Sequence, residues 1–366
     1  MLLKNIYNQE FITNLSENLE IFCKKFNKNL FVKQIFNQNW KDYSLKERMR
    51  HISVIIDQNL LENYQENIKI LKNTAQTIQK FQYSSLSLII FADFVEKFGL
   101  DDFETSIDAL QFFTSFGSSE FAIRKFFLKY EEKTLKKMLE FSLDKNCHIR
   151  RFASEGLRPK LPWGIALKKY QKDPSPILPI LENLKNDKSE YVRRSVANNL
   201  NDISKDNSEI CLRITKKWQQ EGCDAKMIKH SLRTLLKEGN KKALKLVGYG
   251  RINAKIINFN CQDKVKIGED LVFSFVLENL RQSNVRIEYA VYFLLKNNNF
   301  SRKIFQIKQG NFEKKQFLFR RKCSFKKIST RKYYPGAHKV GIILNGEEIL
   351  NRGFTLFARP TTILKN

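Results

Sequence analysis

A ten-residue pattern that occurs twice is the feature that most constrains the fold of this chain. HIRRFASEGL begins at His148 and YVRRSVANNL begins at Tyr191, so the two copies lie 43 residues apart. Each copy carries a β-branched aliphatic residue, an arginine pair and a leucine at matching positions. A period of this length is typical of HEAT and armadillo repeats, in which pairs of helices stack on one another. The pattern therefore predicts a solenoid of stacked helices.

The helical pattern continues to about residue 250 and then changes. Apolar residues recur at helical spacing in LKERMRHISVIIDQNLLENY and TLKKMLEFSLDK. Further along, runs rich in β-branched and aromatic residues alternate with turn signals such as Pro335–Gly336 and Asn345–Gly346. These runs are DLVFSFVLENL, VRIEYAVYFLL, KKQFLFRRK, HKVGIILNG and GFTLFA. We predict an all-α HEAT-like repeat solenoid over residues 1–250 and an antiparallel, immunoglobulin-like β-sandwich over residues 251–366, with the boundary within GYGRINAKI.

The positive charge of the chain is concentrated in its last third. The formal net charge is +27, and residues 251–366 hold 23 Lys and Arg against 8 Asp and Glu. Such a field favours polyanions, above all nucleic acid, with an attraction that weakens steeply as salt is added. The alternative is a basic protein from an AT-rich genome, since Lys, Asn, Ile and Phe are all abundant.

Several classes of protein are disfavoured by the sequence. No stretch approaches the ~18 uncharged apolar residues of a membrane helix, and MLLKNIYNQEFITNL lacks the features of a signal peptide. The six cysteines form no CxxC pair, and the four histidines are dispersed. We therefore predict no disulfide framework, no metal and no membrane association, and we expect a reducing cytoplasm.

Two carboxylates fall at related places in the repeat. Residues four apart share a helix face, so Arg151 is expected above Glu155, and Arg194 on the face of Asn198 and Asp202. Asp202 then projects one turn beyond the position that matches Glu155. Both acids are expected on the side that carries the arginines, which in a solenoid is the concave binding surface. The simpler alternative is that the acids pair with Arg151 and Arg194 and hold the stack together.

An aromatic residue and a third acid lie near these positions. Trp163 follows Leu161–Pro162, and a proline suits the first turn of a helix, which predicts the tryptophan near a helix N-terminus. A tryptophan in such a place more often belongs to a core than to a ligand site. Glu120 follows Gly117–Ser118–Ser119, a helix-start signature, so its simplest role is with the helix dipole in a first turn.

Five segments together resemble the AlkC branch of the bacterial DNA alkylation-repair glycosylases. They are SLKERMRHI, SSEFAIRKF, RRFASEGLRPKLPW, YVRRSVANNLNDISKD and HSLRTLLKEG, and they occur in the family's order over nearly all of residues 1–250. The resemblance implies a HEAT-like fold and a base-excision-repair enzyme that removes N-alkylated bases, chiefly 3-methyladenine and 3-methylcytosine, from double-stranded DNA. Some members also carry an immunoglobulin-like C-terminal domain.

The resemblance also implies the site residues. Glu155 matches the acid of the SEG stretch, Trp163 the aromatic of LPW, Asp202 the aspartate of SVANxLND, and Glu120 the glutamate of TSEFAIR. Residues that depart from the family's pattern are Leu157 and Ser118 in place of Thr, Lys160 in place of Arg, and Lys125 where Pro is common. No departure removes an acid or the tryptophan, so they bear on substrate preference.

A chemical role for acids in a basic chain follows from the implied substrate. A base alkylated at N3 is cationic, and its departure leaves an oxocarbenium-like sugar, which a preorganised carboxylate stabilises. We assign Asp202 to the sugar and to water positioning, and Glu155 to the cationic base or the water, with the two assignments interchangeable. Trp163 offers a π face to the lesion. The pattern is compatible both with base flipping and with excision of an unflipped base.

The cations of the same motifs are predicted to contact DNA phosphates. These residues are Arg150, Arg151, Arg193, Arg194, Arg233 and Lys237. A helix-surface role is the alternative for Arg150 and Arg193. No lysine occupies the SEG or LND positions, so we predict a monofunctional, monomeric enzyme without cofactor at the bacterial nucleoid. The rival interpretations are a catalytically inactive HEAT-repeat nucleic-acid-binding protein and a protein-interaction solenoid.

Overall fold

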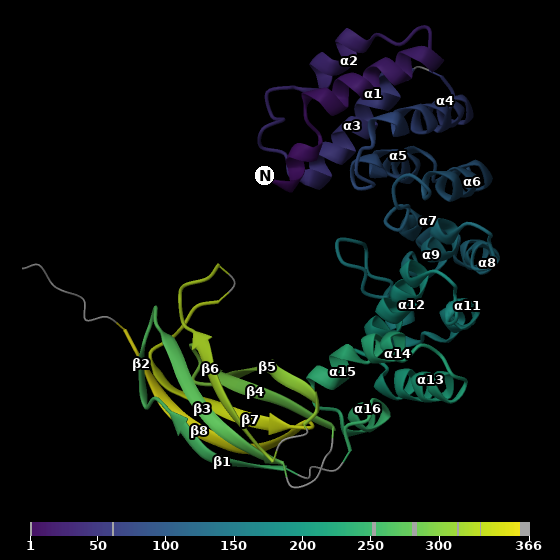
Figure 1. Ribbon diagram of the computed structural model, residues 1–366. Coiled ribbons are helices and arrows are strands. Elements are labelled where there is room, and N and C mark those ends of the chain that lie inside the picture. Colours follow the sequence, from purple (N-terminus) through teal and green to yellow (C-terminus); the bar gives the residue numbers. More distant parts are fainter. Residues whose placement is uncertain are drawn as a thin grey trace, which may run out of the picture. The chain divides into compact units, whose positions relative to one another are not determined.

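The chain folds into two compact units, which a computed structural model describes for residues 2–60, 62–250, 254–279, 284–312, 315–329 and 331–358. The units are Met1–Ser231 and Leu232–Asn366. The first is helical and the second carries the strands, so the predicted fold class of a helical repeat domain followed by a β-sandwich is confirmed (Figure 1). None of the helices in the described ranges has the length and apolarity needed to cross a membrane.

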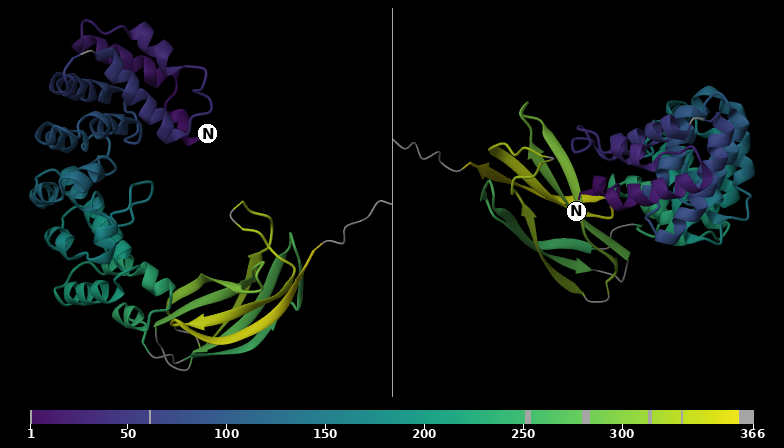
Figure 2. Two further views of the ribbon diagram at one scale, coloured as in Figure 1. Left: turned by 180° about the vertical axis from the view of Figure 1, so that it is seen from behind. Right: turned by 90° about the horizontal axis from the view of Figure 1, so that it is seen from above.

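The first unit is a succession of α-helices joined by short loops and 3₁₀ turns. Its helices are α1 (Gln9–Phe22), α2 (Lys28–Ile35), α3 (Leu45–Leu60), α4 (Tyr64–Ile78), α5 (Ile90–Phe98), α6 (Phe103–Phe113), α7 (Ile123–Lys129), α8 (Glu131–Phe141), α9 (Cys147–Glu155), α10 (Lys168–Lys172), α11 (Leu178–Leu184), α12 (Glu190–Ile203), α13 (Ser208–Gln220) and α14 (Ala225–Ser231). The helices follow one another from α1 at one end of the unit to α14 near the other, as Figure 1 and the left view of Figure 2 show.

Asparagine and aspartate side chains start several of these helices. The side chains of Asn8, Asn63, Asp102 and Asn146 each accept a hydrogen bond from a backbone N–H of the first turn. Each such cap satisfies a donor that has no partner within the helix and stabilises the helix by about 1 kcal/mol. The asparagine-rich composition is thus used where helices begin.

The two copies of the repeated pattern are α9 and α12, which pack against each other. The side-chain amide of Asn199 donates to the carbonyl oxygen of Ser154 at 2.8 Å. Phe152, Val196 and Leu200 are fully buried. The repeat therefore places equivalent faces of two helices in contact, which brings the acid-bearing end of each copy to the same side.

The second unit contains two sheets of strands. The first has the order β1 (Ala254–Cys261), β3 (Asp270–Asn279), β6 (Gln316–Ser324), and the second has the order β2 (Lys264–Lys266), β8 (Glu347–Phe357), β7 (Gly336–Leu344), β4 (Asn284–Leu294), β5 (Phe300–Asn311). Inward side chains of both sheets share one core, where Phe273 of β3 meets Tyr289 of β4 at 5.1 Å between ring centroids. Each of the five runs singled out in the sequence lies mainly on one strand, namely β3, β4, β6, β7 and β8, while Leu280 and Lys314 lie outside the described residues.

One strand pair departs from the predicted antiparallel arrangement. The short strand β2 pairs with β8 in parallel. Only Gln262 and Asp263 separate β2 from β1, and the chain passes from one sheet to the other at these residues. The Asn345–Gly346 turn has positive φ at both residues and closes the β7–β8 hairpin, as such a dipeptide predicts.

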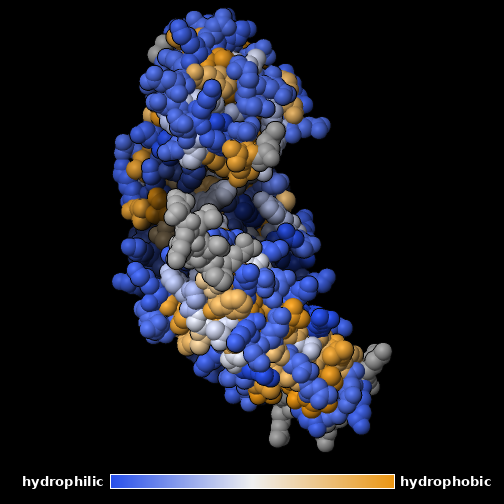
Figure 3. All heavy atoms as spheres, turned by 90° about the vertical axis from the view of Figure 1, so that its left-hand side faces the viewer, coloured by the Kyte–Doolittle hydropathy of each residue, from blue (hydrophilic) through white to orange (hydrophobic). Residues whose placement is uncertain are grey.

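Two short helices precede the first strand and belong to the same compact unit as the sandwich. They are α15 (Arg233–Lys237) and α16 (Lys241–Leu246). A Cβ added to Gly346 would lie 2.9 Å from the carbonyl oxygen of Gly239, so the hairpin turn packs directly on the chain before α16. The second compact unit therefore begins at Leu232, before the predicted boundary within residues 248–256. Residues 251–253 of that predicted boundary lie outside the described ranges. Hydrophilic residues predominate on the face shown in Figure 3.

Candidate functional site

Helix ends and one turn bring the three predicted acids into a single network. Glu155 is the last residue of α9, Asp202 lies in the last turn of α12, and Glu120 lies in the turn before α7. All three side chains are buried, with 5%, 0% and 9% of their residue surfaces exposed. Burial of carboxylates is tolerated only where cations and hydrogen-bond donors surround them.

Arg158 joins two of the acids. Its Nη1 donates to Oε1 of Glu155 at 2.6 Å, and its Nε donates to Oδ2 of Asp202 at 2.8 Å. The remaining oxygens are also occupied, because Ser195 Oγ donates to Glu155 Oε2 at 2.6 Å and Lys205 Nζ donates to Asp202 Oδ1 at 2.8 Å. The two carboxylates thus lie together on adjacent repeats, with a shared guanidinium between them.

Arg151 extends the network to the third acid. Its Nη1 donates to Oε2 of Glu120 and to Oγ of Ser118, and its Nη2 lies 3.7 Å from Oε1 of Glu155. The guanidinium also lies over the ring of Tyr191, 5.2 Å from its centroid. The result is a ladder of alternating charges, which we call the ion ladder: Lys205, Asp202, Arg158, Glu155, Arg151 and Glu120.

The acids of the ladder keep its arginines charged. Burial by itself lowers the pKa of Arg158, but the charges of Glu155 and Asp202 outweigh it and raise that pKa above its ordinary value. Burial likewise opposes the effect of Glu120 and Glu155 on Arg151, and the net result is again a raised pKa. Both arginines therefore stay charged beside the acids.

The simpler prediction for the acids is half right. Glu155 does lie near Arg151, at 3.7 Å, but the cation that joins Glu155 and Asp202 is Arg158, and Arg194 does not take part. Arg194 is exposed and its Nη2 lies 3.2 Å from Oε1 of Glu190, one turn earlier on the same helix. A glutamate four residues before an arginine is the favourable order on a helix, whereas Asp202 lies more than two turns further along α12, about 12 Å from Arg194 along the helix axis. Glu120 also departs from its predicted role, since it precedes α7 and pairs with Arg151 in place of a helix dipole.

The prediction that Trp163 lies near a helix N-terminus is wrong. It lies in the loop between α9 and α10, which projects from the helices beside α9 in Figure 1. The N–H of Gly164 donates to the carbonyl oxygen of Leu161 at 3.1 Å, so Pro162 and Trp163 occupy the middle of a β-turn. Trp163 has φ +65° and 59% of its surface is exposed. A bulky residue in this left-handed conformation is strained, and such strain is concentrated at functional sites.

Two arginines that the sequence does not assign to the site organise it. Arg158 lies in the loop, three residues beyond Glu155, and its spacing to Asp202 carries no signal in the sequence. Arg124 of α7 is fully buried and donates to the carbonyl oxygens of residues 156 and 158, both at 2.9 Å, and of Ile165. Burial and the nearby charge of Arg158 lower the pKa of Arg124 to about 10. An arginine directly after the apolar run Phe121–Ala122–Ile123 is the signal that could have indicated a buried role.

The predicted phosphate-binding residues divide into two groups. Arg150 is buried and donates to both carboxylate oxygens of Asp187, at 2.5 and 2.9 Å, and to two backbone carbonyls. Arg193 donates to the backbone carbonyl of Asp187 at 2.6 Å. These two residues therefore stabilise helix packing. Arg194 and Lys237 are exposed, and Arg233 is half-buried on α15.

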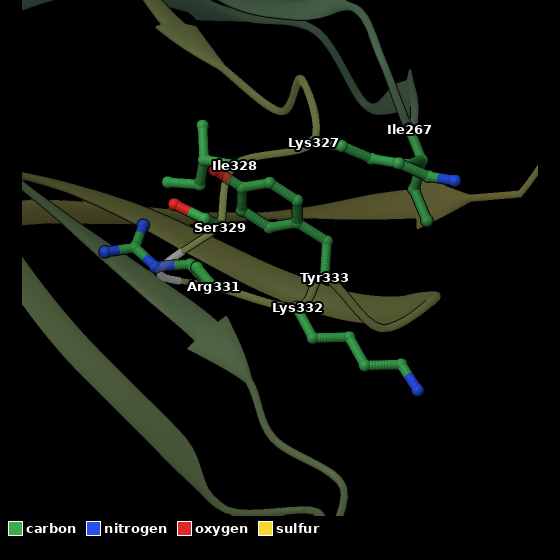
Figure 4. Close-up of a pocket in the computed structure, with 7 residues that line it drawn as sticks. All are labelled: Ile267, Lys327, Ile328, Ser329, Arg331, Lys332 and Tyr333. Carbon is green, nitrogen blue, oxygen red and sulfur yellow. The ribbon is translucent and has the colours of Figure 1, made fainter. Parts of the chain in front are cut away.

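A cationic pocket lies on the sandwich, beside the segment between β6 and β7. Figure 4 shows its lining residues, which are Ile267, Lys327, Ile328, Ser329, Arg331, Lys332 and Tyr333. Three of the seven carry positive charge, and Arg331 lies 4.0 Å from the ring centroid of Phe293. The pocket therefore suits an anionic group. Within the described ranges, no cluster of three or more His, Cys, Asp or Glu is arranged to hold a metal ion.

Both parts of the chain are similar to known proteins. Residues 255–358 match the family model of the C-terminal immunoglobulin-like domain of the uncharacterised protein YhaZ. The chain is 43% identical over 349 residues to uncharacterised YhaZ of Bacillus subtilis (strain 168), which covers 94% of this chain and 96% of YhaZ. The structure of Pseudomonas fluorescens alkylpurine DNA glycosylase AlkC, bound to DNA containing an abasic site analog, matches with TM-score 0.90 and 34% identity, covering 98% of this chain and 100% of that one.

Proposed function

Because this chain belongs to the AlkC family of DNA glycosylases, we propose that it hydrolyses the N-glycosidic bond of cationic N-alkylated bases in double-stranded DNA. The substrates we infer are 3-methyladenine and 3-methylcytosine in the bacterial nucleoid. The observation that carries the proposal is the ion ladder, which holds three carboxylates in place, one of them Glu155 at the start of the loop that exposes a strained tryptophan.

The chemistry of the substrate suits a site of fixed carboxylates. The alkylated base is cationic, and the sugar gains positive character as the glycosidic bond breaks. Carboxylates that are already oriented stabilise this charge without reorganisation, and groups of this kind contribute about 10²- to 10³-fold to a rate. Glu155 and Glu120 retain some exposed surface, so we assign the contact with the base and the positioning of water to them.

Asp202 receives a different role from the one that its sequence motif implies. It has no exposed surface, and both of its oxygens accept hydrogen bonds from cations, so we do not assign water positioning to it. We propose that it holds Arg158 in place and contributes its negative charge to the field at the sugar. Asp202 thus acts as a positioning residue through Arg158.

Trp163 supplies the preference for a cationic base. Its ring is exposed on the loop that follows Glu155, where it can lie against the base. A cation–π contact of about 0.5–2 kcal/mol favours the alkylated base, while a neutral base gains little from it. This difference is the source of selectivity that we propose.

The product is an abasic site, since we infer a monofunctional reaction. A lysine that cleaves the strand must attack the sugar as a neutral amine. Lys205 is the lysine of the ladder, and its Nζ is ion-paired with Asp202. An ammonium has no free electron pair, so we expect water to be the nucleophile.

DNA contacts away from the lesion are proposed for the cations that keep exposed surface. Arg150, Arg151 and Arg193 are engaged within the protein, so the proposal retains Arg194, Arg233 and Lys237 among the six predicted cations. The cations of the sandwich pocket add a second group, which gives affinity without sequence recognition.

The test is release of free base from methylated duplex DNA. Wild type is compared with Glu155→Gln and Glu120→Gln, which keep the shape of each side chain, and DNA binding is measured in parallel. We expect release by wild type and a loss of about 100-fold in each variant, with binding retained. A folded wild-type protein that binds DNA without releasing base would support the inactive nucleic-acid-binding alternative.

A further inference from the structure

The loop that carries Trp163 is held by side chains from two distant helices. Arg124 of α7 donates to three of its backbone carbonyls, those of residues 156, 158 and 165. Lys46, in the first turn of α3, donates from Nζ to the carbonyl oxygen of Trp163 itself at 2.7 Å. These contacts span 41 and 117 residues of sequence at their longest.

The strained turn requires such support. A tryptophan at φ +65° persists only where its surroundings over-determine the backbone. Gly164 allows one of the holding side chains to approach, because a Cβ there would lie 3.2 Å from Cδ of Arg124 and 2.9 Å from Cδ2 of Leu161. The residue after the tryptophan thus lacks a side chain where Arg124 passes beside the turn.

Lys46 is committed to this contact. Among the residues that the structure describes, no carboxylate lies within ion-pairing distance of its Nζ, which lies over the ring of Phe121, 5.5 Å from the centroid. Phe121 directly follows Glu120 of the ion ladder. Lys46 therefore connects α3, the Trp163 carbonyl and the turn that carries the third acid.

We propose that Lys46 and Arg124 are positioning residues that fix the orientation of the Trp163 ring and thereby determine the selectivity for cationic bases. The inference rests on the proposed function. It adds Lys46 of SLKERMRHI and Arg124 of SSEFAIRKF to the residues that support the site. Neither residue touches the substrate. Loss of Lys46 leaves the acids in place and frees the tryptophan, so the reaction survives while discrimination weakens.

Lys46 is the better residue to change, because it is exposed and its loss leaves the fold intact. Lys46→Met retains the aliphatic stem, Lys46→Arg retains a donor for the carbonyl, and Lys136→Met is a control that removes an exposed lysine of α8. Arg124 is less suitable, since removal of its three buried hydrogen bonds would also disturb folding.

Quenching of tryptophan fluorescence by acrylamide reports the state of the turn. Trp163 is 59% exposed, whereas Trp40 and Trp218 are 7% and 1% exposed, so the quenchable signal comes from Trp163. Trp163→Phe gives the baseline. We expect faster quenching in Lys46→Met, the wild-type rate in Lys136→Met, and a return toward wild type in Lys46→Arg.

Selectivity is measured with two duplexes, one containing 3-methylcytosine and one containing a neutral damaged base. We expect the ratio of kcat/KM for the two to fall about three- to tenfold in Lys46→Met, as loss of one charge-assisted hydrogen bond implies. An unchanged ratio with unchanged quenching in Lys46→Met would overturn the inference. Failure of wild type to release any base would instead overturn the proposed function, and the quenching result would still decide whether Lys46 holds the turn.

Discussion

Replacement of Arg158 by methionine is the sharpest test of the ion ladder. Arg158 is 7% exposed and is the shared partner of Glu155 and Asp202, at 2.6 and 2.8 Å. Its loss leaves two buried carboxylates together with no cation between them. Removal of one member of a buried ion network destabilises a protein by about 3–5 kcal/mol, since the remaining charge is left uncompensated. We therefore expect Arg158→Met to lower the free energy of unfolding by about this amount.

Urea unfolding followed by tryptophan fluorescence measures the stability of the compact unit that contains the ion ladder. The three tryptophans of the chain, Trp40, Trp163 and Trp218, all lie in the first compact unit, so the signal reports that unit alone. Lys205→Met is the matched control, because Lys205 binds the same Asp202 from a side chain that is 36% exposed. Arg158 remains bound to Asp202 in this control, so the loss should be smaller, about 1–3 kcal/mol for one oxygen of a buried carboxylate left without a donor.

A double variant separates lost charge balance from lost packing. If the cost of Arg158→Met arises from the uncompensated carboxylates, then Arg158→Met with Glu155→Gln removes one of them and recovers part of the stability. A coupling free energy of about 0.5–3 kcal/mol is expected. A loss of less than about 1 kcal/mol in the single variant, or a double variant whose loss is simply the sum of the two single losses, would refute the ladder as the element that stabilises the acids.

Three other predictions concern separate parts of the chain. Trp163→Gly should raise the free energy of unfolding by about 1 kcal/mol, because glycine relieves the strain at φ +65°, and should lower the rate of base release. Replacement of Lys327, Arg331 and Lys332 by Gln should reduce the slope of log binding constant against log salt by about 1 to 3 in gel-shift titrations, in proportion to the number of phosphates that these side chains neutralise. Burial lowers the pKa of His338 below its ordinary 6.5, so the unfolded chain binds a proton that the folded chain does not. Stability should therefore fall as pH decreases from 6.5 toward the folded-state value, by at most about 1.4 kcal/mol per pH unit, and calorimetry of His338→Gln should show a weaker dependence.

The sequence predicts those features that depend on local period and fails where contacts are distant. The repeat identifies α9 and α12, and alternation identifies five strands, whereas β1, β2 and β5 escape prediction. The short β2 has three residues, and exposed and charged residues interrupt the alternation of β5. Helix spacing predicts that Arg151 approaches Glu155, whereas the bond from Arg158 to Asp202 joins residues 44 apart and has no periodic signal. The error at Trp163 has a different cause. A proline suits the first turn of a helix and equally the second position of a β-turn, so Pro162 alone does not distinguish the two.

The ladder explains why a chain with a net charge of +27 buries acids beside arginines. A carboxylate in a cationic surface would ordinarily be paired by whichever mobile lysine is nearest, and its position would vary. Here each acid accepts a short hydrogen bond from a rigid guanidinium or a hydroxyl, so the position and orientation of its carboxylate group are fixed. Exposure of the acids decreases in order from Glu120 through Glu155 to Asp202, whereas the side chain of Lys205 beyond Asp202 is 36% exposed. Under the proposed function, a cationic base meets Glu120 and Glu155, the two acids that keep exposed surface, while Asp202 stays covered. We therefore expect neutralisation of Glu120 or Glu155 to affect the reaction directly, and neutralisation of Asp202 to affect it through the displacement of Arg158.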